Sequence, residues 1–223
     1  MLSDPVALEV PALSNLALSV FVPENTGPAT WHFESRQTSY VSPPGDFTAS
    51  AVLPAVATPV AWFWLAGVEV AASGQTGTVA IFGESITDGT QSALDGNKRW
   101  PDQFAQRLMA APGNRTTGVL NEGIAGGRLL HDSLGPSGLA RFDRDVLAQT
   151  GVTHVIVQIG INDIFTLNPA EEVTARSGHS GTKAAHRTRT RTRVEDLRLH
   201  LYSGGRVPPA GNPFPHLLAC QGS

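Results

Sequence analysis

The sequence lacks the features on which several common classes of protein depend. It contains a single cysteine, Cys220, which excludes an internal disulfide framework and a zinc site built from cysteines. No apolar run approaches the ~20 residues that a membrane-spanning helix needs. A formal net charge of −3 over 223 residues gives no support for binding to nucleic acid or to an anionic membrane. We therefore expect neither nucleic acid nor a membrane as a partner.

The amino terminus also lacks a basic segment followed by an apolar one, so no secretory signal is visible. The sequence thus predicts a soluble chain and leaves its native compartment open. Hydrophobic residues make up 41% of the chain, which is enough for the core of one domain or of two small ones.

Residues 1–75 are rich in valine, alanine, proline, serine and threonine. Short apolar or alternating runs, separated by proline and glycine, predict strands without helical periodicity. These runs are Leu16–Pro23, Phe47–Pro54 and Pro59–Val70. The pattern predicts a β-rich, sandwich-like module, although ~75 residues is short for a complete sandwich.

Residues 76–175 alternate apolar strands with helical patterns. The predicted strands are Thr78–Phe82, Gly118–Asn121 and His154–Gly160. One helical face is formed by Trp100, Phe104 and Leu108, with Pro101 in the first turn, and another by Leu139, Phe142 and Val146. This alternation predicts an α/β domain with a parallel sheet covered on both faces, and chemistry beyond the carboxyl ends of its strands.

Residues 176–223 have an arginine-threonine alternation, scattered glycine and proline, and little apolar periodicity. Only Val194–Tyr202 has the pattern of a short helix or strand. Because little apolar surface is available to offset the entropy of ordering, we expect a tail of low order.

Three predicted strands deliver a different polar group to the same edge of the sheet. Ser85 follows the first strand, Gly126 lies in a glycine-rich loop after the second, and Asn162 follows the third. Acyl transfer needs a nucleophile together with N–H donors aimed at the developing oxyanion. Each residue alone also has a structural explanation, as a helix cap, a turn glycine or an Asx-turn. Their occurrence together favours the catalytic interpretation.

The stretches "GESITDG", "NEGIAG" and "GIND" resemble the first three motif blocks of the SGNH, or GDSL-type, hydrolases, which are serine esterases on a flavodoxin-like sheet. The resemblance covers about residues 76–170, and the segment before it is similar to the β-rich module of one bacterial branch. It implies that Ser85 is the nucleophile, that Gly126 and Asn162 complete the oxyanion hole, and that no cofactor is needed.

Two departures from the family pattern stand out. Glu84 occupies the position where the family usually has aspartate, which keeps the acidity and adds one methylene. The fourth block, Asp-x-x-His near the carboxyl terminus, is absent after Asn162. The hypothesis that follows is a truncated or frame-disrupted member without the last strands.

The missing block leaves the general base to another histidine. The candidates are His131, His154, His179, His186, His200 and His216. Asp196 and His200 would share one face if their segment were helical. We also expect Glu84, Asp88, Asp163 and His131 to contact substrate. No metal site is predicted, because a site needs three or four converging ligands and sequence shows no such set.

The preferred hypothesis is an enzyme that hydrolyses small-molecule carboxylic esters, with short-chain acyl or acetyl groups on small alcohols or sugars. One alternative is a catalytically weak or dead remnant that binds carbohydrate or a partner. Another is self-association, in which a partner chain donates the missing histidine.

Overall fold

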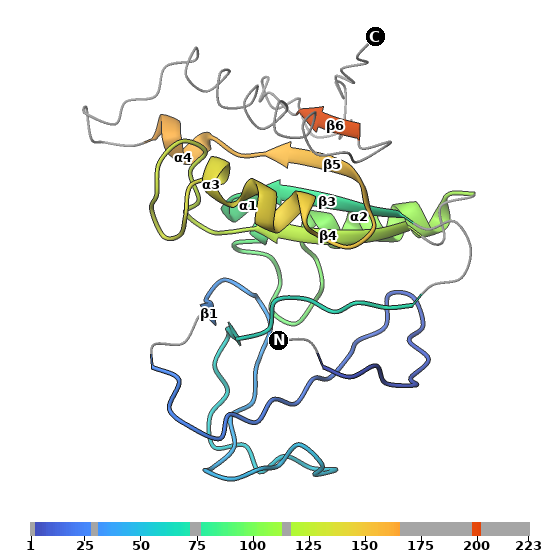
Figure 1. Ribbon diagram of the computed structural model, residues 1–223, viewed down its shortest axis with the longest axis vertical. Coiled ribbons are helices and arrows are strands. Elements are labelled where there is room, and N and C mark those ends of the chain that lie inside the picture. The colour runs from blue at the N-terminus through green and yellow to red at the C-terminus, as the bar shows by residue number, and fades with distance from the viewer. Residues whose placement is uncertain (1–2, 28–30, 72–76, 113–116, 166–197, 202–223) are drawn as a thin grey trace.

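The computed structural model describes residues 3–27, 31–71, 77–112 and 117–165, and the backbone of 198–201. Its centre is a parallel sheet of β3 (Gly77–Gly83), β4 (Thr117–Gly123), β5 (Val152–Gln158) and β6 (Arg198–Leu201), arranged in the order β4-β3-β5-β6. The helical segments are α1 (Ser85–Asp88), α2 (Trp100–Ala110), α3 (Gly138–Phe142), the π-helix η1 (Asp143–Leu147) and α4 (Ile161–Ile164). Figure 1 shows the sheet with these helices beside it.

The sheet confirms the predicted α/β architecture. β3, β4 and β5 correspond to the three predicted strands, with ends that differ by at most two residues. β3 lies between β4 and β5, so the chain leaves β3 toward one neighbour and returns later to the other. The carboxyl end of such a strand is a switch point of an open α/β sheet, where ligands bind.

The core lies between the sheet and the α3–η1 segment. Phe82 of β3 and Phe142 of α3 meet edge to face, with ring centroids 5.3 Å apart. Val146 and Val155 are fully buried beside them. Of the expected helical face, Phe142 and Val146 are buried in the core, whereas Leu139 is 37% exposed, and the three residues are divided between α3 and η1.

The amino-terminal segment has much less β structure than its composition predicts. Its described residues form one antiparallel pair, β1 (Trp31–His32) with β2 (Trp62–Phe63), and an isolated bridge between Val41 and Ala57. Strands expected at 16–23 and 47–54 are absent, so these two predictions were wrong. Side chains such as Val52, which is 81% exposed, have no second sheet to cover them in the described part of the chain.

The segment 176–223, expected to be of low order, supplies one strand. β6 pairs in parallel with β5, and His200 lies opposite Ile156. The short element anticipated within 194–202 is thus a strand. The rest of that segment lies outside the described residues. No helix in the described ranges is both long and apolar enough to cross a membrane.

Candidate active site at the strand ends

Ser85 begins helix α1 directly beyond the end of β3, as expected from the sequence. Gly83 at that end is paired with Gly123 of β4 and with Gln158 of β5. The three strands therefore end side by side, and the segments that follow them begin at the same edge of the sheet. Ser85 is half-buried, and its N–H belongs to the first turn of α1, where backbone donors have no intrahelical partner.

Side chains from both neighbouring strands hold α1 in place. The Thr87 hydroxyl donates to Oε1 of Gln158 over 2.9 Å, and Nδ2 of Asn121 donates to the Thr87 carbonyl oxygen over 2.9 Å. A Cβ on Gly123 would lie 2.2 Å from the Asp88 nitrogen, so only glycine permits this close approach. The helix that carries Ser85 is consequently fixed against the tips of β4 and β5.

The loop after β4 turns back toward β3. The Ile124 N–H donates to the Gly83 carbonyl over 3.2 Å, and the Gly127 N–H donates to Ile124 over 2.9 Å. Between them, Gly126 has φ +75°, in the left-handed region that glycine adopts without strain. The Ser133 hydroxyl donates to the Gly126 carbonyl over 2.6 Å, which fixes the orientation of that peptide.

Asn162 contacts this same loop. It lies in α4, and its Nδ2 atom donates to the Gly127 carbonyl oxygen over 2.8 Å. An amide nitrogen carries two hydrogens, so one N–H remains for a further acceptor. The structure thus brings Asn162 next to the Gly127–Arg128 peptide of the loop that contains Gly126, and Ser85 follows the neighbouring strand β3.

Two of the carboxylates expected to contact substrate have a different environment. Asp163 is 2% exposed, and its two oxygens accept the N–H groups of Leu129 at 2.6 Å and Leu130 at 3.0 Å. Asp88 is 1% exposed, and its Oδ2 accepts the Ala125 N–H at 2.9 Å. Both carboxylates therefore anchor the loop around Gly126, and their expected contact with substrate stays a prediction.

Glu84 is also buried, at 1% exposure. The pKa of its carboxyl is raised to about 7, mainly by burial and also by the negative charge of Asp163, while backbone N–H groups and Arg141 act in the opposite direction. Its Oε2 has no hydrogen-bond partner among the described residues. Glu84 is thus a buried carboxyl that directly precedes Ser85, and its contact with substrate stays a prediction.

A buried arginine ties the strand ends together. Arg141 of α3 donates to the Glu122 carbonyl over 3.0 Å, to the Gly83 carbonyl over 2.8 Å and to Asp145 over 3.1 Å. Its guanidinium also lies over the Phe82 ring, 4.0 Å from the centroid. Sequence reasoning missed this residue, because nothing in its spacing distinguishes it from a solvent-exposed helical arginine.

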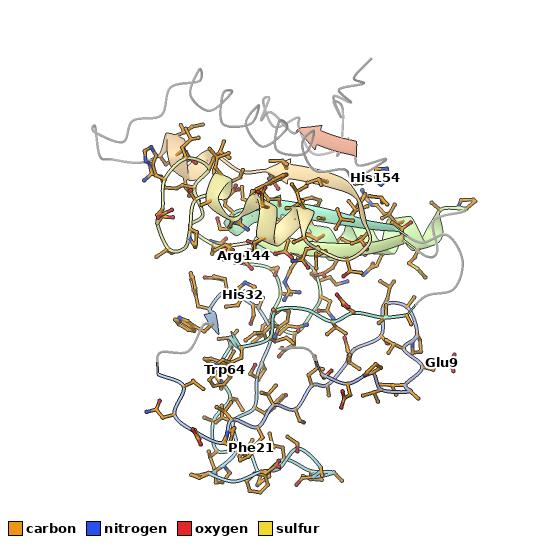
Figure 2. All side chains as sticks on the ribbon, in the orientation of Figure 1. Glu9, Phe21, His32, Trp64, Arg144 and His154 are labelled. Atoms are coloured by element: carbon orange, nitrogen blue, oxygen red, sulfur yellow. The ribbon has the colours of Figure 1, made fainter. Side chains whose placement is uncertain are left out.

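The described histidines differ in their distance from this edge. His131 is half-buried and follows Leu130, whose N–H is held by Asp163 next to Asn162. His154 lies near the start of β5, bonded to the Thr153 hydroxyl at 2.9 Å, at the other end of the strand from α4 (Figure 2). Only the former is close in the chain to the candidate site.

The proposed pairing of Asp196 with His200 on one helical face was wrong at His200, whose backbone lies in β6. There it is level with Ile156, in the middle of the sheet. The remaining candidates lie outside the described residues; they are Asp196, His179, His186 and His216.

Sequence reasoning also missed His32. Its Nε2 lies 2.5 Å from Oδ1 of Asp88, a residue 56 positions further along the chain. The sequence predicts that residues 1–75 form a separate module, and nothing in the spacing of His32 places it near Asp88. The only sequence signal is the alternation Trp31-His32-Phe33, which sets a polar side chain between two aromatic ones.

Comparisons with solved structures find proteins of similar fold. They include AlinE4, an SGNH-hydrolase family esterase, at 18% identity, covering 57% of this chain and 60% of that one, with a TM-score of 0.44. A lipase/acylhydrolase from Enterococcus faecalis is 21% identical, with 55% of each chain covered and a TM-score of 0.40. The chain spans less than two thirds of the length of these proteins. A comparison with curated proteins gives no match.

A comparison with protein families matches residues 79–206 to GDSL-like Lipase/Acylhydrolase. This match covers more than half of the chain, and it includes most of β3 and all of α1, the Gly126 loop, α4 and β6. It also extends beyond residue 175, where the sequence analysis set the end of the α/β domain. The chain belongs to the family of GDSL-like lipases and acylhydrolases.

Proposed function

We propose that the protein hydrolyses carboxylic esters through an acyl-enzyme formed on Ser85. The observation that carries this proposal is the 2.8 Å hydrogen bond from Asn162 to the Gly127 carbonyl, which holds one expected oxyanion donor against the residue that follows another, Gly126. In this arrangement the N–H groups of Ser85 and Gly126 and the Asn162 amide stabilise the oxyanion.

The reaction has two steps. The Ser85 oxygen forms a bond to the ester carbonyl carbon while a histidine accepts the hydroxyl proton. The tetrahedral intermediate then expels the alcohol, which takes that proton from the histidine. Water attacks the acyl-enzyme in the same way and releases the carboxylic acid.

Among the described histidines, His131 is the candidate that we propose as the base. It follows a backbone segment that Asp163 anchors beside Asn162, whereas His154 lies near the far end of β5. A positioned base contributes about 10²–10⁴-fold to the rate. Without one, an oxyanion hole and binding still give roughly 10³–10⁴-fold over water, so weak turnover is expected even if no histidine serves.

The substrate class rests on the resemblance to serine esterases of this family. We propose short-chain acyl or acetyl esters, with small alcohols or sugars as leaving groups.

The test is the hydrolysis of p-nitrophenyl acetate by wild type, Ser85→Ala and the exposed control Ser14→Ala. We expect Ser85→Ala to lose at least 10²-fold in kcat and Ser14→Ala to lose nothing. A fluorophosphonate probe should add its mass to Ser85 in wild type only. Equal rates in wild type and Ser85→Ala, with no labelling, would eliminate the esterase proposal.

A site completed by a second copy of the chain has its own signature. If a partner chain donates the missing histidine, specific activity should rise with protein concentration. Activity strictly proportional to concentration between nanomolar and micromolar protein would exclude that arrangement.

A second candidate function, carbohydrate binding, is favoured by exposed aromatic rings on the amino-terminal segment. The rings of Trp31 and Phe63 are nearly parallel, at 12° and 6.3 Å between centroids, and Trp31 is 59% exposed. Exposed apolar patches of this kind often mark binding surfaces. Tryptophan fluorescence during titration with xylohexaose or cellohexaose should change in wild type and not in Trp31→Ala; no change in wild type with either sugar would count against this function.

A further inference from the structure

A side chain of the amino-terminal segment contacts a buried carboxylate beneath the candidate active site. His32 is the second residue of β1, and its Nε2 contacts Oδ1 of Asp88 at 2.5 Å. The His32 side chain is 34% exposed, while that of Asp88 is fully buried. Trp31 and Phe33, on the other face of this strand segment, lie against each other with ring centroids 5.8 Å apart.

Asp88 also contacts the Gly126 loop, which carries the second proposed oxyanion donor. Its other oxygen, Oδ2, accepts the Ala125 N–H at 2.9 Å, and Ala125 immediately precedes Gly126. The backbone N–H of Asp88 donates to Glu84 over 2.8 Å, so the same residue closes helix α1. One carboxylate therefore joins β1, the Ser85 helix and the Gly126 loop.

Further contacts hold this part of the amino-terminal segment in position. Arg36 donates twice to the Ser92 carbonyl, over 2.9 and 2.7 Å, and Thr38 donates to both oxygens of Asp95. Arg99 donates to the Ser35 carbonyl. These bonds fasten residues 35–38 to the loop that follows α1, and they keep His32 next to Asp88 without involving the site itself.

We propose that His32 is a positioning residue for ester hydrolysis: through Asp88 it orients the Ala125–Gly126 peptide toward the oxyanion. This inference rests on the proposed function for its kinetic consequence, and on the geometry alone for its structural one. A buried carboxylate oxygen without a partner is costly, so removal of His32 shifts Asp88 and releases the Ala125 N–H. A displacement of about 1 Å in a catalytic group can lower the rate about 10²-fold.

The central variants are His32→Leu, which removes the donor, and His32→Gln, whose Nε2 can replace the imidazole Nε2. We expect kcat for p-nitrophenyl acetate to fall about 10- to 100-fold in His32→Leu, with KM changed less than about two-fold, and to recover most of its value in His32→Gln. Thr38→Val removes one of the hydrogen bonds that fasten residues 35–38 to the loop after α1, away from the site. This variant should retain full kcat.

A second readout does not depend on activity. Hydrogen exchange at the Ala125 amide should be at least ten-fold faster in His32→Leu than in wild type, and close to wild type in His32→Gln and Thr38→Val. If His32→Leu does not fold, His32→Asn serves, since its amide is too short to reach Asp88; it should behave as the donor-less variant.

The outcomes separate the two proposals. If Ser85→Ala retains full activity, the esterase proposal fails, and the exchange rates still decide the role of His32. If Ser85→Ala is inactive but His32→Leu or His32→Asn keeps both wild-type kcat and wild-type Ala125 exchange, His32 has no positioning role. Equal losses in Thr38→Val and the His32 variants would likewise overturn it, because docking alone would then explain the effect.

Discussion

The guanidinium of Arg141 donates a 2.8 Å hydrogen bond to the carbonyl oxygen of Gly83, two residues before Ser85. The same group binds the Glu122 carbonyl at the end of β4. Since strand β3 leads into the Ser85 helix and β4 into the Gly126 loop, one buried cation fixes the relative position of both.

Replacement of Arg141 by methionine should therefore destabilise the protein strongly. The change removes both carbonyl contacts and leaves Asp145, which is 7% exposed, without its buried partner. Loss of one member of a buried pair costs about 3–5 kcal/mol. Urea unfolding of Arg141→Met measures this cost.

Arg144→Met is the matched control, because Arg144 also binds Asp145 but has a side chain that is 65% exposed. This substitution should lower the free energy of unfolding by less than about 1 kcal/mol. Equal losses in the two variants would show that burial of Arg141 is unimportant.

Removal of the Asn162 amide tests the oxyanion donor directly. In Asn162→Ala the bond to Gly127 and the second N–H are both lost. Loss of one oxyanion donor costs about 10²–10³-fold in kcat, so we expect a decrease of that size with little change in KM. Steady-state kinetics with p-nitrophenyl acetate provide the measurement, with Gln149→Ala, a half-buried residue ahead of β5, as the control. A rise in KM at constant kcat would instead assign Asn162 to substrate binding.

The sheet could be predicted from the sequence because each strand is an apolar run that ends in glycine or a polar residue. Burial on both faces leaves little ambiguity for such runs, and β3 and β5 were located on this basis. The π-helix at Asp143–Leu147 could not be predicted, since apolar spacings of three and four residues fit a continuous α-helix equally well.

The amino-terminal prediction failed for a different reason. Strand-like composition at residues 16–23 supplies propensity, but a strand also needs a partner with which to pair. Leu18 in that run is 50% exposed and pairs with no strand in the described part of the chain. The prolines that bound these runs remove the N–H groups that a ladder would use.

The positions of Ser85, Gly126 and Asn162 after neighbouring strands could be predicted, because each follows an apolar run in the sequence; their roles stay predictions. The contacts of Asp88 and Asp163 could not be predicted, because a carboxylate after a strand has the same local sequence whether it faces solvent or a buried backbone N–H. His32 was out of reach for a related reason: its contact with Asp88 joins segments that are remote in sequence.

The raised pKa of Glu84, about 7, predicts a pH-dependent stability. The folded state favours the protonated carboxyl, so this residue costs nothing below its ordinary pKa of 4.5, and its cost grows as pH rises from 4.5 to about 7. Glu84→Gln should therefore gain stability relative to wild type at pH 8, by up to about 3 kcal/mol, and gain much less at pH 5.

Urea unfolding of both proteins at the two pH values measures the effect. The comparison with wild type at each pH is needed because the pKa of Glu122 is also raised to about 7, mainly by burial. Glu122 therefore adds its own pH dependence to the stability of both proteins. The exposed variant Glu9→Gln should show no such change between pH 5 and pH 8. A Glu84→Gln gain that is equal at both pH values would mean that the wild-type carboxyl does not titrate in this range.

Alanine at Gly126 should separate backbone strain from the role of this loop in the site. Gly126 and Gly27 have nearly the same φ, +75° and +74°. Alanine in this left-handed region costs roughly 1–2 kcal/mol at either position. A Cβ at Gly27 meets nothing within 4 Å, whereas at Gly126 it lies 2.6 Å from Leu134 Cδ1, the end of a side chain that is 69% exposed and free to move aside.

We therefore expect similar losses of stability from Gly126→Ala and Gly27→Ala in thermal unfolding. Only Gly126→Ala should lose activity, by about 10²-fold in kcat, because its strained peptide carries the proposed oxyanion donor. Equal kcat in the two variants would show that the Gly126 N–H does not act on the substrate.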